Sequence, residues 1–114
     1  MQLVREKISL DELKKMAQKM YNNLVKAVVD IEKDIMIVDA GLHADQEEAL
    51  LESGSAQENL WGINLHPVKF GSDDFIEFDS MINIRPSQGN FYRGVNDLAI
   101  QEKIISIVKH LVCV

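Results

Sequence analysis

Cysteine is almost absent from this 114-residue sequence, in which Cys113 is the single example. One cysteine cannot form an intramolecular disulfide, and this composition is typical of proteins from a reducing compartment. Cys113 is also a poor candidate for a nucleophile, because residues beside a chain end are often frayed and badly positioned. We therefore expect a cytoplasmic protein without a catalytic cysteine.

Long apolar runs are missing as well. Apolar runs such as residues 35–38 are far shorter than the about 20 residues that span a bilayer. The first ten residues alternate charges with single apolar side chains and lack the apolar core of a signal peptide. These features predict no membrane partner and agree with a cytoplasmic location.

The chain also lacks a basic stripe. Its 18 acidic and 12 basic residues give a formal net charge of −6. A polyanion partner requires clustered lysine and arginine side chains that neutralise phosphates. We therefore expect no nucleic-acid partner, although a local pocket for a small anion is still compatible with this charge.

No internal repeat, low-complexity tract or linker rich in proline, glycine or serine interrupts the sequence. With 46% apolar and 26% charged residues, the composition is ordinary for a globular protein. Folding at this length buries roughly two thirds of the surface that the unfolded chain exposes. We expect a single domain over residues 1–114 that needs no disulfide or metal for its stability.

Two helices have clear starting signals. Ser9 begins a capping box, and apolar side chains then recur at helical spacing, which predicts a helix over 10–22 after a short edge strand over 2–8. Asn96 is placed to cap a second helix over 96–112, whose apolar side chains form one face.

Strands are predicted between these helices. Alternating and β-branched apolar side chains predict a hairpin of strands 24–31 and 35–40, and a further strand over 60–66. Capping-box spacing with Gly54 as a stop predicts a short helix near 45–53.

The segment 75–85 alternates in the same way and is predicted as the longest strand. Alternatively, Asp79 and Ser80 bend or break it, because aspartate and serine are poor strand formers. Hairpins together with segregated helices predict an α+β fold, in which two longer helices (10–22, 96–112) pack on one side of a mainly antiparallel sheet.

The segment from Arg85 to Arg93 is the strongest candidate for a binding surface. It joins a strand end to a helix start, its glycines allow close approach of the backbone, and guanidinium groups suit carboxylate or phosphate. The candidate residues are Arg85, Ser87, Gln88, Gly89, Asn90 and Arg93. In the alternative interpretation, the two arginines pair with Glu77, Asp79 or Asp97 and the segment is an ordinary turn. Within it, Phe91 and Tyr92 are either buried anchors or exposed contacts for a partner.

A polar sheet face is the second candidate. If strand 60–66 pairs with 75–85, one side of the sheet collects polar side chains that could exchange protons or bind a divalent ion. These are Asn64, His66, Glu77, Asp79, Asn83 and Arg85. The alternative is the solvated outer face that one-sided sheets normally have.

A third group contains metal-ligand residue types without metal-site spacing. Its members are Asp39, His43, Asp45, Glu47 and Glu48. We interpret this group as a loop and a helix N-terminus, where acids are favourable against the helix dipole. We expect no metal and no cofactor, and no catalytic role for His110.

Residues 57–65 and 76–90 resemble a small prokaryotic family of single-domain proteins that is classed as a domain of unknown function. The resemblance extends over nearly the whole chain. It implies a prokaryotic, cytoplasmic protein, and it supplies no activity, cofactor or site.

The leading hypothesis is a small cytoplasmic binding module, expected to be a homo-oligomer, that uses the 85–94 segment for a small anion or a protein partner. One alternative is a small metal-dependent or acid–base enzyme that uses Asp79, Glu77 and His66 of the polar sheet face, with Arg85 to bind an anion. Another is an antitoxin-like regulatory partner, whose acidity would suit a basic protein target.

Overall fold

Three neighbouring strands form the centre of the molecule: β3 (Val25–Asp30), β4 (Ile35–Val38) and β5 (Leu60–Leu65). In this computed structural model, which describes all 114 residues, β1 (Gln2–Val4) pairs with β4 and β6 (Ile76–Glu77) pairs with β5. The strand order is β1-β4-β3-β5-β6, and every neighbouring pair is antiparallel. The predicted mainly antiparallel sheet of an α+β fold is therefore confirmed.

The predicted hairpin is the β3–β4 pair, in which Asp30 lies opposite Ile35. Its turn contains no glycine, but Asp34 adopts a left-handed conformation with φ 58°, which aspartate tolerates better than most residues. The Asp30 carboxylate accepts hydrogen bonds from the backbone N–H groups of Glu32 (2.9 Å) and Lys33 (3.0 Å). These two bonds hold the turn without a glycine.

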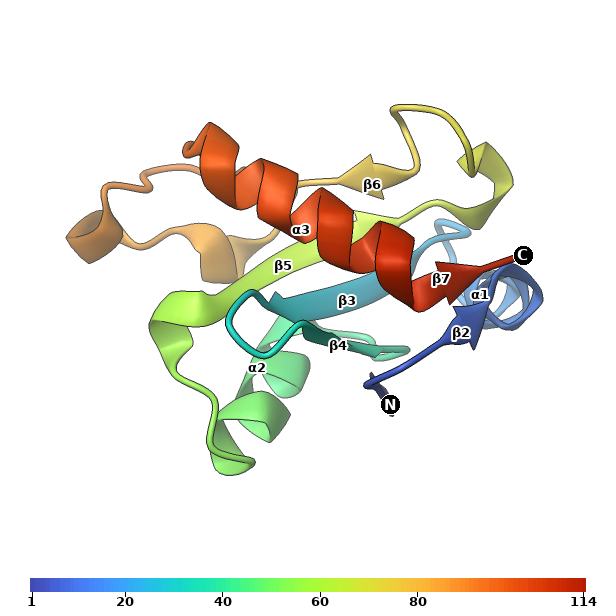
Figure 1. Cartoon of the computed structure of the whole chain (residues 1–114), viewed down its shortest axis with the longest axis horizontal. Helices are drawn as coiled ribbons and strands as arrows, with labels where there is room; N and C mark the ends of the chain where they lie inside the picture. The colour runs from blue at the N-terminus through green and yellow to red at the C-terminus, as the bar shows by residue number, and fades with distance from the viewer.

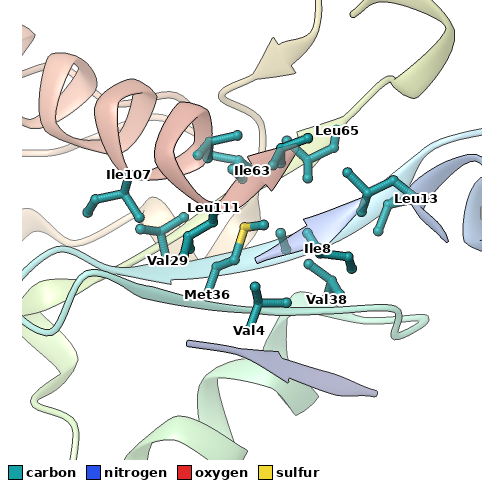
Figure 2. Packing of buried hydrophobic residues seen from close by; sticks show 14 of the residues in the cluster. Val4, Ile8, Leu13, Val29, Met36, Val38, Ile63, Leu65, Ile107 and Leu111 are labelled. Atoms are coloured by element: carbon teal, nitrogen blue, oxygen red, sulfur yellow. The ribbon is translucent and has the colours of Figure 1, made fainter. Parts of the chain in front are cut away.

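Helices α1 (Leu10–Gln18) and α3 (Leu98–Leu111) cover one face of the sheet, as predicted. Figure 2 shows Ile107 and Leu111 of α3 against Val29 and Met36 of the sheet. This face holds the larger of two apolar clusters, with 20 buried residues. Burial of these apolar side chains holds both helices against the central strands.

The starts of these helices follow their capping residues. Ser9 Oγ accepts a hydrogen bond from Glu12 N at 3.1 Å, so the predicted cap of α1 is confirmed. In α3 the cap is Asp97, whose Oδ1 accepts from Ala99 N at 2.8 Å, and not Asn96.

The short helix α2 (His43–Glu52) lies on the opposite face of the sheet from α3 (Figure 1). There Leu50 joins a smaller cluster of five buried residues that also includes Val28 and Leu60. Four single turns of 3-10 helix complete the connections: η1 (Gln57–Asn59), η2 (Pro67–Lys69), η3 (Met81–Asn83) and η4 (Pro86–Gln88).

The predicted strand over 2–8 is divided into β1 and β2 (Ile8–Ser9). β2 pairs in parallel with β7 (Val112–Cys113), which places the residues before α1 beside the end of α3 (Figure 1). None of the helices has the length and apolar character needed to cross a membrane.

The prediction of one long strand over 75–85 is wrong, because only Ile76 and Glu77 pair as a strand, and the alternative of a break at Asp79 and Ser80 is the one that the structure shows. The chain turns away at Ser80, whose N–H donates to the Arg93 carbonyl (2.9 Å) and whose Oγ accepts from Ile82 N (3.3 Å). Serine competes for backbone hydrogen bonds in this way, which is why it disfavours a continuing ladder.

Candidate functional site

Side chains take the place of a strand along β5 where β6 ends. Asn83 Nδ2 donates to Gly62 O (2.9 Å), and Asn83 Oδ1 accepts from Gly62 N (2.8 Å). A carboxamide has the donor and acceptor of a peptide group, so Asn83 completes the ladder that β6 leaves unfinished. Gly62 is required here, because an added Cβ would lie 2.5 Å from Ser80 Oγ.

Asn90 holds the base of the 85–94 segment from inside. Its Nδ2 donates to the carbonyls of Asn83 (2.7 Å) and Gly94 (2.8 Å), and its Oδ1 accepts from Asn96 N (2.8 Å). Asn90 also forms an isolated antiparallel bridge with Arg85. We call the buried side chains of Asn83, Arg85 and Asn90 the polar brace.

Arg85 is buried, and its guanidinium donates to the carbonyls of Gln57 and Leu60. Its Cζ lies 4.1 Å from the ring centroid of Trp61, which is a cation–π contact. Burial lowers the pKa of Arg85, while the charge of Glu47 acts in the opposite direction. The predicted position of Arg85 on a strand face beside Glu77 and Asp79 is therefore wrong.

Arg93 pairs with Asp79, with 2.6 Å between Nε and Oδ1, at the protein surface. Ser87, Gln88 and Gly89 are exposed, and Gln88 Nε2 donates to Glu58 O at 3.1 Å. The segment thus does not bring the guanidinium groups of Arg85 and Arg93 together at one anion site.

The tip of the same segment carries two exposed aromatic side chains. Phe91 is 71% exposed and Tyr92 is 52% exposed. The ring of Tyr92 lies over Gly94, because a Cβ built on Gly94 would meet the ring at 2.6 Å. We call Phe91 and Tyr92 the aromatic tip.

The polar sheet face is present in part. Asn64 and Glu77 are paired across β5 and β6, with Asn64 Nδ2 donating to Glu77 Oε1 at 2.9 Å. His66 Nε2 lies 3.2 Å from the same oxygen. The hydrogen bond from Asn64 is the main cause that lowers the pKa of Glu77, with a further contribution from His66. Asn83 and Arg85 do not join this group.

Chemically, the Glu77 carboxylate can accept a hydrogen bond from the His66 imidazole and so orient the ring. Asn64 Nδ2 also donates to the Asp79 carbonyl at 3.2 Å, whereas the Asp79 carboxylate is engaged by Arg93. Asn64 Oδ1 is buried and has no hydrogen-bond partner in the chain. The face therefore contains the His66–Glu77 pair and one acceptor atom, Asn64 Oδ1, without a hydrogen-bond partner in the chain.

His43 begins α2 and is buried against β5, with Nε2 2.7 Å from the Ile63 carbonyl. Because a carbonyl can only accept, Nε2 carries the proton, and burial lowers the pKa of the ring.

The acidic residues of the same predicted group lie elsewhere. Asp39 pairs with Lys19 at 3.1 Å, and Asp45 lies in the first turn of α2. No three His, Cys, Asp or Glu side chains are grouped as metal ligands.

An apolar groove was not predicted from the sequence. It is a groove of about 530 Å³ between β6, the 70–73 loop and the C-terminal half of α3. The apolar residues that line it are Phe70, Phe75, Ile76, Phe78 and Ile105. Asp73 and the exposed Lys109 also line it. The only signal in the sequence is the set of three phenylalanines and Ile76 among the polar residues of the stretch 70–78.

Comparison with known proteins gives one match. Neither a curated protein nor a solved structure matches the chain. A family model described as "Protein of unknown function (DUF5674)" matches residues 2–111, which agrees with the resemblance seen in the sequence. The chain, with its polar brace, its polar sheet face and its groove, belongs to the DUF5674 family.

Proposed function

We propose that this domain is a binding module whose contact surface for a protein partner is the aromatic tip. The observation that carries the proposal is the polar brace: three buried polar side chains hold in place a segment whose aromatic residues remain exposed.

The brace matters because a rigid loop loses little conformational entropy on binding. Each brace residue is removed from water and is hydrogen-bonded to the backbone of its neighbours. Tyrosine is among the residue types that contribute most to the affinity of protein interfaces, and aromatic side chains are enriched there. A fixed segment with Phe91 and Tyr92 at its tip is thus suited to a protein surface.

The contacts of the arginines favour a protein partner over a small anion. The Arg85 guanidinium donates to two backbone carbonyls, and Arg93 contacts the Asp79 carboxylate. The net charge of −6 favours a partner with a basic surface, which the field of an acidic protein attracts.

The test places a photo-crosslinking amino acid at Phe91 and, as a control, at the fully exposed Tyr21. We expect one discrete adduct with a protein from extracts of the source cell at position 91 and none at position 21. With the partner purified, Phe91→Ala is expected to weaken binding about 30-fold, the effect of losing roughly 2 kcal/mol at an interface. Tyr21→Ala should leave the affinity unchanged.

Equal crosslinking at both positions, or equal affinities of the purified Phe91→Ala and wild-type proteins, would contradict the proposal. Circular dichroism is the control for folding, and Phe91→Ala should leave the spectrum intact because the side chain is exposed.

We propose in addition a cytoplasmic location in a prokaryote and a homodimeric state. The single cysteine supports a reducing compartment. The measurement for the oligomeric state is sedimentation equilibrium, and a monomer at all concentrations would contradict a homodimer.

A further inference from the structure

Strand β6 lies at an open edge of the sheet, with β5 on one side only. Its ladder contains the pair Asn64–Glu77, and His66 N donates to Phe75 O at 2.8 Å. Successive residues of an antiparallel strand direct their backbone groups to opposite sides. The N–H and C=O of Ile76 therefore point away from β5, toward the open edge.

The groove lies beside this edge, on the face of the sheet that α3 covers. Ile76 and Phe78 contribute to it from β6 and the residues that follow, and Ile105 contributes from α3. Phe70 and Phe75 add an edge-to-face aromatic pair with centroids 5.1 Å apart. A strand added outside β6 would have the side chain opposite Ile76 directed to this same face.

The other face of the edge carries the Glu77 carboxylate. Glu77 is 47% exposed, and both of its hydrogen bonds use Oε1, so Oε2 is left for a partner. In an added strand, the residues next to the one opposite Ile76 point to the face of Glu77. The charge of this carboxylate favours lysine or arginine there.

We infer that β6 binds an extended basic segment of a partner protein as a sixth strand of the sheet. The segment pairs with the backbone of Ile76, places one large apolar side chain in the groove and places lysine or arginine beside Glu77. This binding by strand addition is a known mode of peptide recognition. It is separate from the aromatic tip and does not depend on it.

A second copy of the chain fits this edge less well. Antiparallel pairing of two β6 strands centred on Ile76 would place the two Glu77 side chains at diagonal positions on one face of the joint sheet and would supply neither carboxylate with a cation. A basic segment meets the same edge with the opposite charge.

The probe is a seven-residue peptide with blocked ends, in which lysines flank a central phenylalanine in an otherwise threonine sequence. Titration followed by amide NMR should shift the Ile76 and Ile105 signals and slow hydrogen exchange at Ile76 N–H. Two matched peptides separate the contributions: one N-methylated at the phenylalanine, which removes a backbone donor, and one with glutamate in place of lysine. Each should bind at least 10-fold more weakly.

Two protein variants complete the experiment. Ile105→Glu places a charge in the groove from a half-buried position of α3 and should weaken the peptide at least 10-fold. Phe91→Ala should leave its affinity unchanged, so that failure of this site and failure of the aromatic tip are distinguishable.

Three results would overturn the inference. The first is no shift at Ile76 with 1 mM peptide, roughly the weakest affinity that counts as recognition. The second is equal binding of the N-methylated or the glutamate peptide, which would mean that neither strand pairing nor charge is used. The third is protection of Ile76 without peptide that grows with protein concentration, which would mean that a second copy occupies the edge.

Discussion

Asn83 joins the segment after β6 to the central strand β5. Its carboxamide pairs with both backbone groups of Gly62 and also donates to Arg93 O at 3.0 Å. A residue that replaces a strand in this way has no polar substitute of the same shape except aspartate, which lacks the donor.

Asn83→Leu is expected to lower the free energy of unfolding by about 2–4 kcal/mol, because two buried backbone groups of Gly62 lose their partners. Urea denaturation measures the change. Asn22→Leu, at an exposed turn position, is the control and should stay within about 0.5 kcal/mol of wild type. If Asn83→Leu also changed the free energy of unfolding by no more than about 0.5 kcal/mol, water would be taking the place of the carboxamide.

Gly62→Ala is expected to cost about 1–3 kcal/mol, because the new Cβ would lie 2.5 Å from Ser80 Oγ and 2.6 Å from Ser80 Cβ. Adding Ser80→Gly removes both of these contacts and should restore part of the stability. Gly41→Ala is the matched control, since no atom lies within 4 Å of its added Cβ. Equal thermal melting temperatures of Gly62→Ala and Gly41→Ala would contradict the close approach.

The buried imidazole of His43 should make stability depend on pH. Burial lowers the pKa of this ring below its usual 6.5, so the unfolded chain binds its proton first as the pH falls. Stability should therefore decrease below about pH 6.5, where the unfolded state holds more protons. Denaturation from pH 7.5 to 5.0 measures this slope. His43→Gln should flatten it, whereas His110→Gln, at an exposed position, should not; an unchanged slope in His43→Gln would contradict the prediction.

At the scale of elements, the parts that local sequence determines were predicted best. A cap and a stripe of apolar residues lie within one helix, so α1 and α3 could be located without knowledge of the rest of the chain. In the 75–85 segment two local signals conflict. Its alternation is that of a strand, but Asp79 and Ser80 are poor strand formers, and the ladder ends before them at Glu77.

The candidate sites could also be predicted only where a local sequence pattern determines them. Strand alternation, with the assumed pairing of 60–66 and 75–85, placed His66, Asn64 and Glu77 on one face, whereas the register of Asn64 with Glu77 is known only from the structure. Arg85 could not be placed, because its partners are Trp61 and backbone carbonyls that carry no sequence pattern. The groove depends on how α3 lies beside β6, which no local signal encodes.

The α1 cap gives a prediction at this scale. Ser9→Ala removes the oxygen that accepts from Glu12 N and should cost about 1 kcal/mol. Thermal denaturation checks this value against Ser106→Ala, an exposed position within α3. Equal melting temperatures of the two variants would mean that packing alone fixes the start of α1.

At the scale of the whole molecule, the acidic charge and the two candidate surfaces suggest one arrangement. The aromatic tip precedes α3, whereas the groove lies beside the C-terminal half of that helix, so the surfaces belong to different ends of α3. A single basic partner could contact both, and linked contacts of this kind gain affinity through effective concentration.

The parallel pair β2–β7 has a consequence for how the protein is made. Cys113 Sγ donates to the carbonyl of Ile8 across a separation of 105 residues, and the same pairing connects the start of α1 to the end of α3. Contacts this distant along the chain form late in folding. During synthesis, the β2–β7 pair can therefore form only after α3 has been made, although the apolar side of α1 can already pack on the earlier strands of the sheet.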